Sequence, residues 1–152
     1  MKILISFIAS LAINSSYPNP EEINRQEVFC LSKAVYHEGR GEPLIGKIAI
    51  GHVILNRVKS SSYPNTVCGV VYQPKQFTGI RFRKLGAGDF SRNSWKESVE
   101  VATLSYIGFI DDPTNGATMY YNPRKVNDPR WDFTKLTLVG DIYNHRFYHE
   151  NR

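Results

Sequence analysis

Glu38 is the residue whose type and position best suit chemistry, because it closes a predicted helix. A stripe of apolar residues at helical spacing precedes it on the same, inward-facing side: Leu31, Ala34 and Val35. Gly39 and Gly41 follow, and glycine readily takes the left-handed conformation that ends helices. A carboxyl group there is partly desolvated, which raises its pKa and suits it to protonate a glycosidic oxygen. The alternatives are an ion pair with Arg40 or Arg57, or an exposed helix end.

The other polar residues form no recognised catalytic motif. The HExxH, G-x-S-x-G, P-loop and G-x-G-x-x-G patterns are absent from the sequence. His37 adjoins Glu38 but points in another direction on a helix, and Glu42 could cap the second helix near its positive end. No metal site is predicted from the other histidines: His52, His145 and His149. Some aspartates could supply a second carboxylate, although their positions are typical of turns and loops: Asp89, Asp111, Asp112, Asp128 and Asp132.

Two predicted helices position Glu38. The first opens at a capping box, NRQE at residues 24–27, and ends at the glycines after Glu38. The second begins with Pro43, which suits a first helical turn, and continues through an almost entirely apolar stretch to Val58. A helix that is apolar on all sides is usually buried in the centre of its domain.

The remaining elements are predicted to be shorter. Residues 66–72 fit either a short helix or a strand, and residues 73–93 read as a long irregular loop rich in Gly and Arg. A second capping box, SWKE at residues 94–97, opens another helix. Residues 117–122 are predicted as a strand and residues 134–148 as extended or mixed structure. Helices followed by short strands predict an α+β fold.

Composition and charge restrict the class of protein. The chain has 152 residues, enough for one domain, and its 41% hydrophobic and 22% charged residues disfavour disorder. Nineteen Lys and Arg against fourteen Asp and Glu give a net charge of +5. Because these charges are dispersed, no nucleic-acid interface is indicated. A modest positive field favours an acidic polymer or surface as partner.

The first 22 residues are predicted to form an export signal and a linker. Lys2 precedes an apolar run at residues 3–13, which contains a weak small-x-small cleavage pattern, and a polar, Pro-containing stretch follows at residues 14–22. The run is shorter than the about 20 apolar residues that span a membrane, so no stable membrane anchor is expected. The alternative is a hydrophobic strand or helix of the fold.

Cys30 and Cys68 are the two cysteines of the chain. In an exported protein they would form a disulfide, which would stabilise the fold by roughly 3–4 kcal/mol on the chain-entropy model. In a cytosolic protein two buried thiols would be expected. The disulfide prediction therefore depends on export.

Several blocks of sequence carry a family pattern. The first reads Tyr-x-Glu-x-Arg-Gly-Glu, the second is the apolar helix that ends in Leu-Asn-Arg-Val, and the third runs from Pro-x-Thr-Val-Cys to Gln-x-x-Gln-Phe. The matching positions are Tyr36, Glu38, Arg40, Gly41, Glu42, Gly46, Asn56, Arg57, Pro64, Thr66, Gln73 and Phe77. With GATMYYN at residues 116–122, Trp131 and IYNHRFY at residues 142–148, the blocks closely resemble the cell-wall hydrolase family typified by spore cortex-lytic enzymes. The chain departs from the family pattern at Gly39, usually Ala, at Met119, often His, and at Tyr143, usually Gly.

The resemblance implies a lysozyme-like helical core with a small β subdomain, and it makes residues 23–152 the catalytic domain. It implies a lytic transglycosylase that cleaves peptidoglycan between N-acetylmuramic acid and N-acetylglucosamine, with Glu38 as the catalytic acid. Six residues are expected to line the groove: Gln73, Gln76, Phe77, Tyr120, Tyr121 and Asn122. For each of them the alternative is a structural role in the core or in a turn. Arg40 is expected to hold the glycine turn by binding Glu42 or another carboxylate. A Cys30–Cys68 disulfide would brace the Glu38 helix.

The expected partner is peptidoglycan, with no cofactor, no metal and no nucleic acid, and the expected state is a monomer. The place of action would be the periplasm, the cell envelope or the extracellular space, for a bacterial envelope enzyme or a phage endolysin. One alternative is a muramidase, which releases hydrated ends and needs a second carboxylate. Others are a non-catalytic basic domain that binds glycan or nucleic acid, and a zinc amidase, for which no ligand set is visible.

Overall fold

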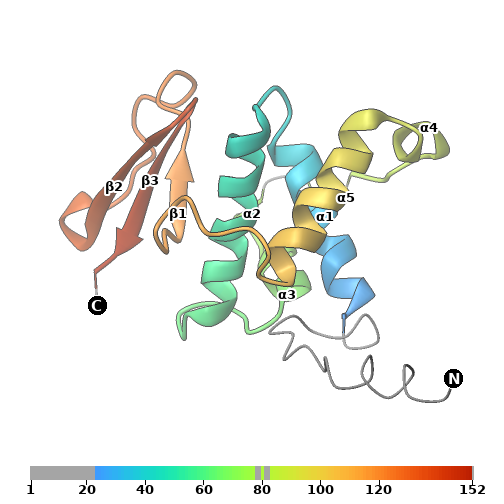
Figure 1. The fold of residues 1–152 in the computed structure, drawn as a ribbon. Coiled ribbons are helices and arrows are strands. Elements are labelled where there is room, and N and C mark those ends of the chain that lie inside the picture. The colour runs from blue at the N-terminus through green and yellow to red at the C-terminus, as the bar shows by residue number, and fades with distance from the viewer. Residues whose placement is uncertain (1–22, 78–79, 81–82, 152) are drawn as a thin grey trace, which may run out of the picture.

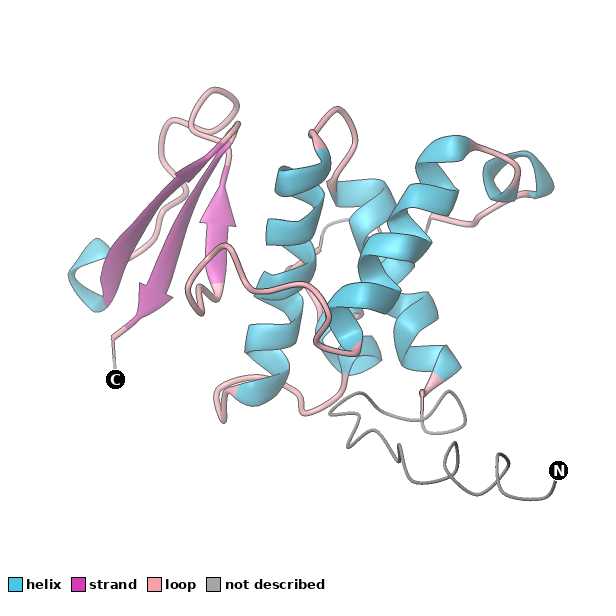
Figure 2. Cartoon of the chain, viewed as in Figure 1, coloured by secondary structure: helices cyan, strands magenta, loops and turns pink. Residues whose placement is uncertain are grey.

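A computed structural model describes residues 23–77, 80 and 83–151, so the predicted export signal and linker at residues 1–22 lie outside the described residues. The helices are α1 (Arg25–Glu38), α2 (Leu44–Lys59), α3 (Val67–Val71), α4 (Ala87–Phe90) and α5 (Asn93–Tyr106). The strands are β1 (Met119–Tyr121), β2 (Leu136–Ile142) and β3 (His145–Glu150), with a 3₁₀ turn, η1 (Phe133–Lys135), before β2. The three strands form an antiparallel sheet in the order β1-β3-β2. Figure 2 shows the α-helices gathered on one side and the strands, with the short turn η1, on the other, as the predicted α+β fold requires.

Helix α2 lies between the sheet and the other helices (Figure 1). Its Ile48 and Ile54 belong to the larger apolar cluster with α1, α3 and α5, whereas Ala49 and Val53 face Ala117 and Phe147 at the sheet. A helix packed on two opposite sides needs apolar residues around its whole circumference. This explains the all-round apolar sequence that predicted a central helix.

Helix α1 begins as predicted, but its capping box is only half formed. The Asn24 side chain accepts hydrogen bonds from the backbone amides of Gln26 and Glu27, at 3.1 and 3.2 Å, as an N-cap does. The Glu27 carboxylate does not return to Asn24. It binds the backbone amides of Val67 and Cys68 at the start of α3, because the first amides of a helix have no partner within it.

The second predicted capping box, at residues 94–97, is wrong. Helix α5 already begins at Asn93, and no side chain caps it. Glu97 forms an ion pair with Lys47 of α2, so its carboxylate ties two helices together. The loop predicted at residues 73–93 also contains α4, a single turn in which Asp89 accepts a hydrogen bond from the Gly86 amide at 3.0 Å.

Residues 66–72, which fitted a helix or a strand, form α3, and the Thr66 side chain caps it by accepting from the Gly69 amide at 3.0 Å. A disulfide joins Cys30 of α1 to Cys68 of α3, with a Cα–Cα distance of 5.2 Å. The Glu27 carboxylate binds α3 beside this bridge. The start of α1 is therefore held at α3 by a covalent and a polar contact.

None of the described helices combines the length and the apolar character needed to cross a bilayer.

Candidate active site

Glu38 closes α1 and is half-buried beside the turn that leads to α2. Burial raises the pKa of its carboxyl group, and the positive charge of Arg83 opposes this rise. No described residue forms a hydrogen bond or an ion pair with Glu38, so neither Arg40 nor Arg57 is its partner. A carboxyl group with these properties holds its proton to a higher pH than an ordinary glutamate.

The turn after Glu38 differs in detail from the prediction. Gly39 ends the helix at φ −86°, so the left-handed residue of this turn is Gly41, at φ +78°. Arg40 was expected against a carboxylate, but its guanidinium lies over the Tyr36 ring, 5.9 Å from the ring centre. The reason is that Glu42 turns inward, away from the exposed Arg40, and is itself buried.

Tyr120 of β1 lies on the sheet face that packs against α2. Its ring stacks on Phe147 at 5.6 Å and meets the edge of His145 at 5.1 Å. Burial raises the pKa of Tyr120, the negative charges of Glu38 and Glu42 raise it further, and only the charge of Arg57 opposes them. The hydroxyl group therefore stays protonated and can donate a hydrogen bond near Glu38.

Tyr121 and Asn122 lie differently, because neighbouring side chains of a strand point to opposite faces. Tyr121 stacks on Tyr148 at 6.2 Å and meets Trp131 edge-on at 5.4 Å, on the sheet face away from Tyr120. The Asn122 side chain accepts from the Arg124 amide at 2.9 Å and so supports the turn after β1. Of these three predicted residues, Tyr120 is the one on which the charge of Glu38 acts, whereas its two neighbours have packing and turn contacts.

Two of the predicted residues at 73–77, Gln76 and Phe77, contact the buried side chain of Arg57. The Arg57 guanidinium donates to the Gln76 side chain at 3.0 Å and to the Thr118 carbonyl at 2.7 Å, and it lies 5.2 Å from the centre of the Phe77 ring. Phe77 is buried in the larger apolar cluster, while Gln73 keeps a buried side-chain oxygen without a partner among the described residues. Arg57 thereby links the start of β1 to this segment.

The aspartates considered as a second carboxylate are mostly engaged in turns. Asp112 accepts from the Thr114 and Gly116 amides at 2.8 and 2.7 Å. Asp128 accepts from the Arg130 amide at 2.8 Å, and Asp132 from the Thr134 hydroxyl. Asp89 bonds the Tyr36 hydroxyl at 2.9 Å besides capping α4, and Asp111 is exposed. Within the described part of the chain, no three His, Cys, Asp or Glu residues are grouped so as to hold a metal ion.

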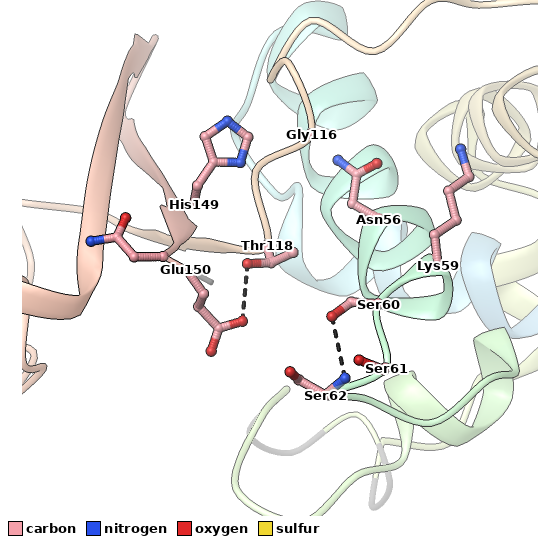
Figure 3. Close-up of a pocket in the computed structure, with 10 residues that line it drawn as sticks. Asn56, Lys59, Ser60, Ser61, Ser62, Gly116, Thr118, His149 and Glu150 are labelled. Atoms are coloured by element: carbon pink, nitrogen blue, oxygen red, sulfur yellow. Dashed lines mark hydrogen bonds between the residues drawn. The ribbon is translucent and has the colours of Figure 1, made fainter.

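Two cavities lie near opposite ends of α2. One of about 580 Å³ opens between the end of α2, the loop before β1 and the end of β3 (Figure 3), where Glu150 accepts from Thr118 at 3.2 Å. None of the residues predicted to bind substrate lines it. The other, of about 210 Å³, lies between the turn at Arg40 and the start of α5. Glu38 lines neither cavity.

Sequence reasoning missed three parts of this site. Arg83 lies in a segment predicted as an irregular loop, which carried no signal for a charge near Glu38. Asn144 and His145 reach Glu42 from the turn between β2 and β3, 102 residues further along the chain in the case of Asn144. The IYNHRFY block at residues 142–148 marked this turn as part of the family pattern, but it did not indicate the contact.

Comparison with known proteins shows which family the chain resembles. The profile of the cell wall hydrolase family matches residues 41–148, beginning just after Glu38. Curated relatives include the spore cortex-lytic enzymes of Bacillus cereus, 35% identical over 116 residues, and of Bacillus subtilis, 33% identical over 124 residues. These matches cover 76% and 80% of this chain but 42% and 38% of the relatives. The chain thus spans about two-fifths of the length of these curated relatives.

Solved structures agree with the sequence matches. The catalytic domain of the germination-specific lytic transglycosylase SleB from Bacillus anthracis is similar at a TM-score of 0.64 and 33% identity, over 85% of this chain and 98% of that chain. The catalytic domain of the Bacillus cereus SleB protein has a TM-score of 0.62 at 33% identity, over 88% of this chain and 95% of that chain. These likenesses confirm the predicted lysozyme-like core with a small β subdomain. On fold, sequence and matched length together, the chain belongs to the cell wall hydrolase family.

Proposed function

We propose that this protein cleaves the glycan strand of peptidoglycan between N-acetylmuramic acid and N-acetylglucosamine, as a lytic transglycosylase that forms 1,6-anhydro ends. The observation that carries the proposal is the carboxyl group of Glu38, which is partly desolvated, unpaired among the described residues and close enough to Tyr120 to act on it electrostatically. The likeness to a catalytic domain whose title names it a lytic transglycosylase supports the same activity.

In the proposed reaction a single carboxyl group acts twice. Glu38 first protonates the glycosidic oxygen, and the bond from that oxygen to C1 of N-acetylmuramic acid breaks. The carboxylate then takes the proton from the 6-hydroxyl of the same sugar as its oxygen bonds to C1 and closes the ring. The proton returns to Glu38 and no water is consumed. Because the substrate supplies the nucleophile, the second carboxylate of an ordinary glycosidase is not required.

Other residues would bind the substrate rather than react with it. We propose that Tyr120 donates a hydrogen bond near the reacting carboxyl group, and that Gln73 and Gln76 bind N-acetyl groups through their amides. The net charge of +5 would favour binding to an acidic envelope. Such an enzyme acts at the envelope or outside the cell, as a monomer, in a bacterial or a phage lysis setting.

Product masses test the proposal directly. Purified peptidoglycan is digested in ¹⁸O-labelled water and the soluble fragments are weighed by mass spectrometry. A transglycosylase releases fragments lighter than hydrated muropeptides by one water molecule and without the label. Labelled reducing ends would show a muramidase instead. Free stem peptides without the label, together with label on the lactyl carboxyl group of the glycan, would show an amidase. Release of no fragments would favour a binding domain.

The pH dependence of cleavage should follow the protonation of Glu38. The acid must carry its proton, and burial raises its pKa, so kcat/KM should fall as pH rises through a value above the ordinary 4.5. The charge of Arg83 lowers this pKa, so Arg83→Gln should move the falling limb to higher pH. Lys84→Gln, at the exposed neighbouring residue, is the matched control and should leave the limb in place. A limb that stays fixed or moves to lower pH in Arg83→Gln would contradict the assignment.

A further inference from the structure

Glu42 is a buried carboxylate for which the proposed reaction has no use. It lies in the turn between α1 and α2 with 8% of its surface exposed. Its Oε1 accepts a hydrogen bond from Asn144 Nδ2 at 3.0 Å and lies 3.6 Å from His145 Nδ1. Its Oε2 is buried without a partner among the described residues and packs against Gly46, where a Cβ atom would come within 2.8 Å of it. Burial of an incompletely paired carboxylate is costly, so its retention calls for a physical reason.

One of the two residues that contact Glu42, His145, also contacts Tyr120. Asn144 and His145 belong to the hairpin formed by β2 and β3. The His145 ring meets the Tyr120 ring edge-on at 5.1 Å, and the charge of Glu38 acts on the Tyr120 hydroxyl group. Contacts therefore connect Glu42 to the hairpin and the hairpin to Tyr120, whose hydroxyl group interacts electrostatically with Glu38.

The hairpin has other contacts that hold it together. β2 and β3 pair from Leu136–Glu150 to Ile142–His145 with one irregularity between Leu138 and Gly140, and Asp141 binds Arg146 through two hydrogen bonds at 2.7 and 2.9 Å. Phe147 anchors the sheet in the apolar cluster with α2. Glu42 is not needed for these contacts. It adds a polar link between the hairpin and the turn that follows Glu38.

We propose that Glu42 is a positioning residue of the glycan-cleaving reaction, holding the β2–β3 hairpin against the α1–α2 turn so that Tyr120 stays opposite Glu38. The inference rests on the proposed function and deepens it. Burial lowers the pKa of His145, so at neutral pH its contact with Glu42 is that of an uncharged ring, although Glu42 opposes this shift. What the hairpin requires from residue 42 is therefore an acceptor atom rather than a charge.

The test measures kcat and KM on solubilised peptidoglycan strands at a temperature well below the melting transition of every variant. Glu42→Ala should lower kcat by about 10- to 100-fold, the loss expected for a displacement of about 1 Å, with KM changed less than about threefold. Glu42→Gln keeps the acceptor atom and should stay within about threefold of the wild type. Asn144→Ala should lower kcat in the same direction, and the double variant should be no slower than Glu42→Ala alone, because the two residues act as a unit.

Asp141→Ala is the matched control, since it removes a carboxylate from the same hairpin without touching Glu42, and it should cleave like the wild type. Full kcat in Glu42→Ala, equal losses in Asp141→Ala, or a Glu42→Gln variant as slow as Glu42→Ala would each overturn the positioning role. If Glu42→Ala does not fold, Glu42→Gln and Asn144→Ala still decide the question. A wild type that releases no fragments would overturn the proposed function, whereas an active wild type with an equally active Glu42→Ala would overturn this inference alone.

Discussion

Replacement of Glu38 by glutamine is expected to slow glycan cleavage by about three orders of magnitude. Glutamine has nearly the same shape and can still form hydrogen bonds, but it has no proton to give to the glycosidic oxygen. Both steps of the proposed reaction therefore fail in this variant. The measurement is the initial rate of fragment release from purified peptidoglycan, with the wild type alongside.

The same variant should remain folded, and its stability follows from the direction of the pKa shift. Burial raises the pKa of Glu38 in the folded state, so the stability that its proton contributes is present at low pH and is lost as pH rises through that raised value. Glutamine cannot ionise. Above that pH, Glu38→Gln should therefore unfold at an equal or higher denaturant concentration than the wild type.

Glu100→Gln provides the control, because Glu100 is an exposed residue of α5 and the change removes the same charge. It should leave both cleavage and stability unaltered. If Glu38→Gln kept substantial cleavage while folded, Glu38 would not be the catalytic acid. If it lost cleavage together with its fold, the stability argument would fail.

The helices were predictable where their signal is local, and the errors come from partners distant in sequence. Apolar periodicity correctly predicts α1 and the buried α2, because each pattern is complete within one segment. Both predicted capping boxes fail at their glutamate. Glu27 binds α3 and Glu97 binds Lys47, 40 and 50 residues away along the chain. Such partners become available only when the helices pack.

In the candidate site, too, the features encoded locally were predictable and the contacts between residues distant in sequence were not. Glu38 could be found from a helix end, an apolar stripe and the glycines after it. The separation of Tyr120 from Tyr121 depends on which face of β1 meets α2, and that is set by the pairing of Tyr120 with Phe147. Period-two alternation already implied that only one of the two neighbouring tyrosines could face Glu38. The contact of Glu42 with Asn144 spans 102 residues and left no local trace.

Reduction of the Cys30–Cys68 disulfide is expected to lower the free energy of unfolding by about 4 kcal/mol. The bridge closes a loop with a sequence separation of 38, and opening it restores chain entropy to the unfolded state. The folded state keeps the Glu27 contacts with α3 and the apolar packing around it, so the loss should appear in stability before it appears in cleavage. Denaturant unfolding with and without a phosphine reductant measures the difference.

A Cys30→Ala/Cys68→Ala variant separates the cross-link from the reductant, since it should unfold at one denaturant concentration whether or not reductant is present. Its free energy of unfolding should lie near that of the reduced wild type. It should be lowered further by the packing lost when the buried sulfur of Cys30 is removed. Glu38 follows Cys30 on the same helix, so α1 and its carboxyl group should stay in place while the domain remains folded. Cleavage at low temperature should therefore survive reduction, and its half-life on heating should shorten. Equal unfolding of the oxidised and reduced wild type would show that Glu27 and the apolar contacts alone hold α1 to α3.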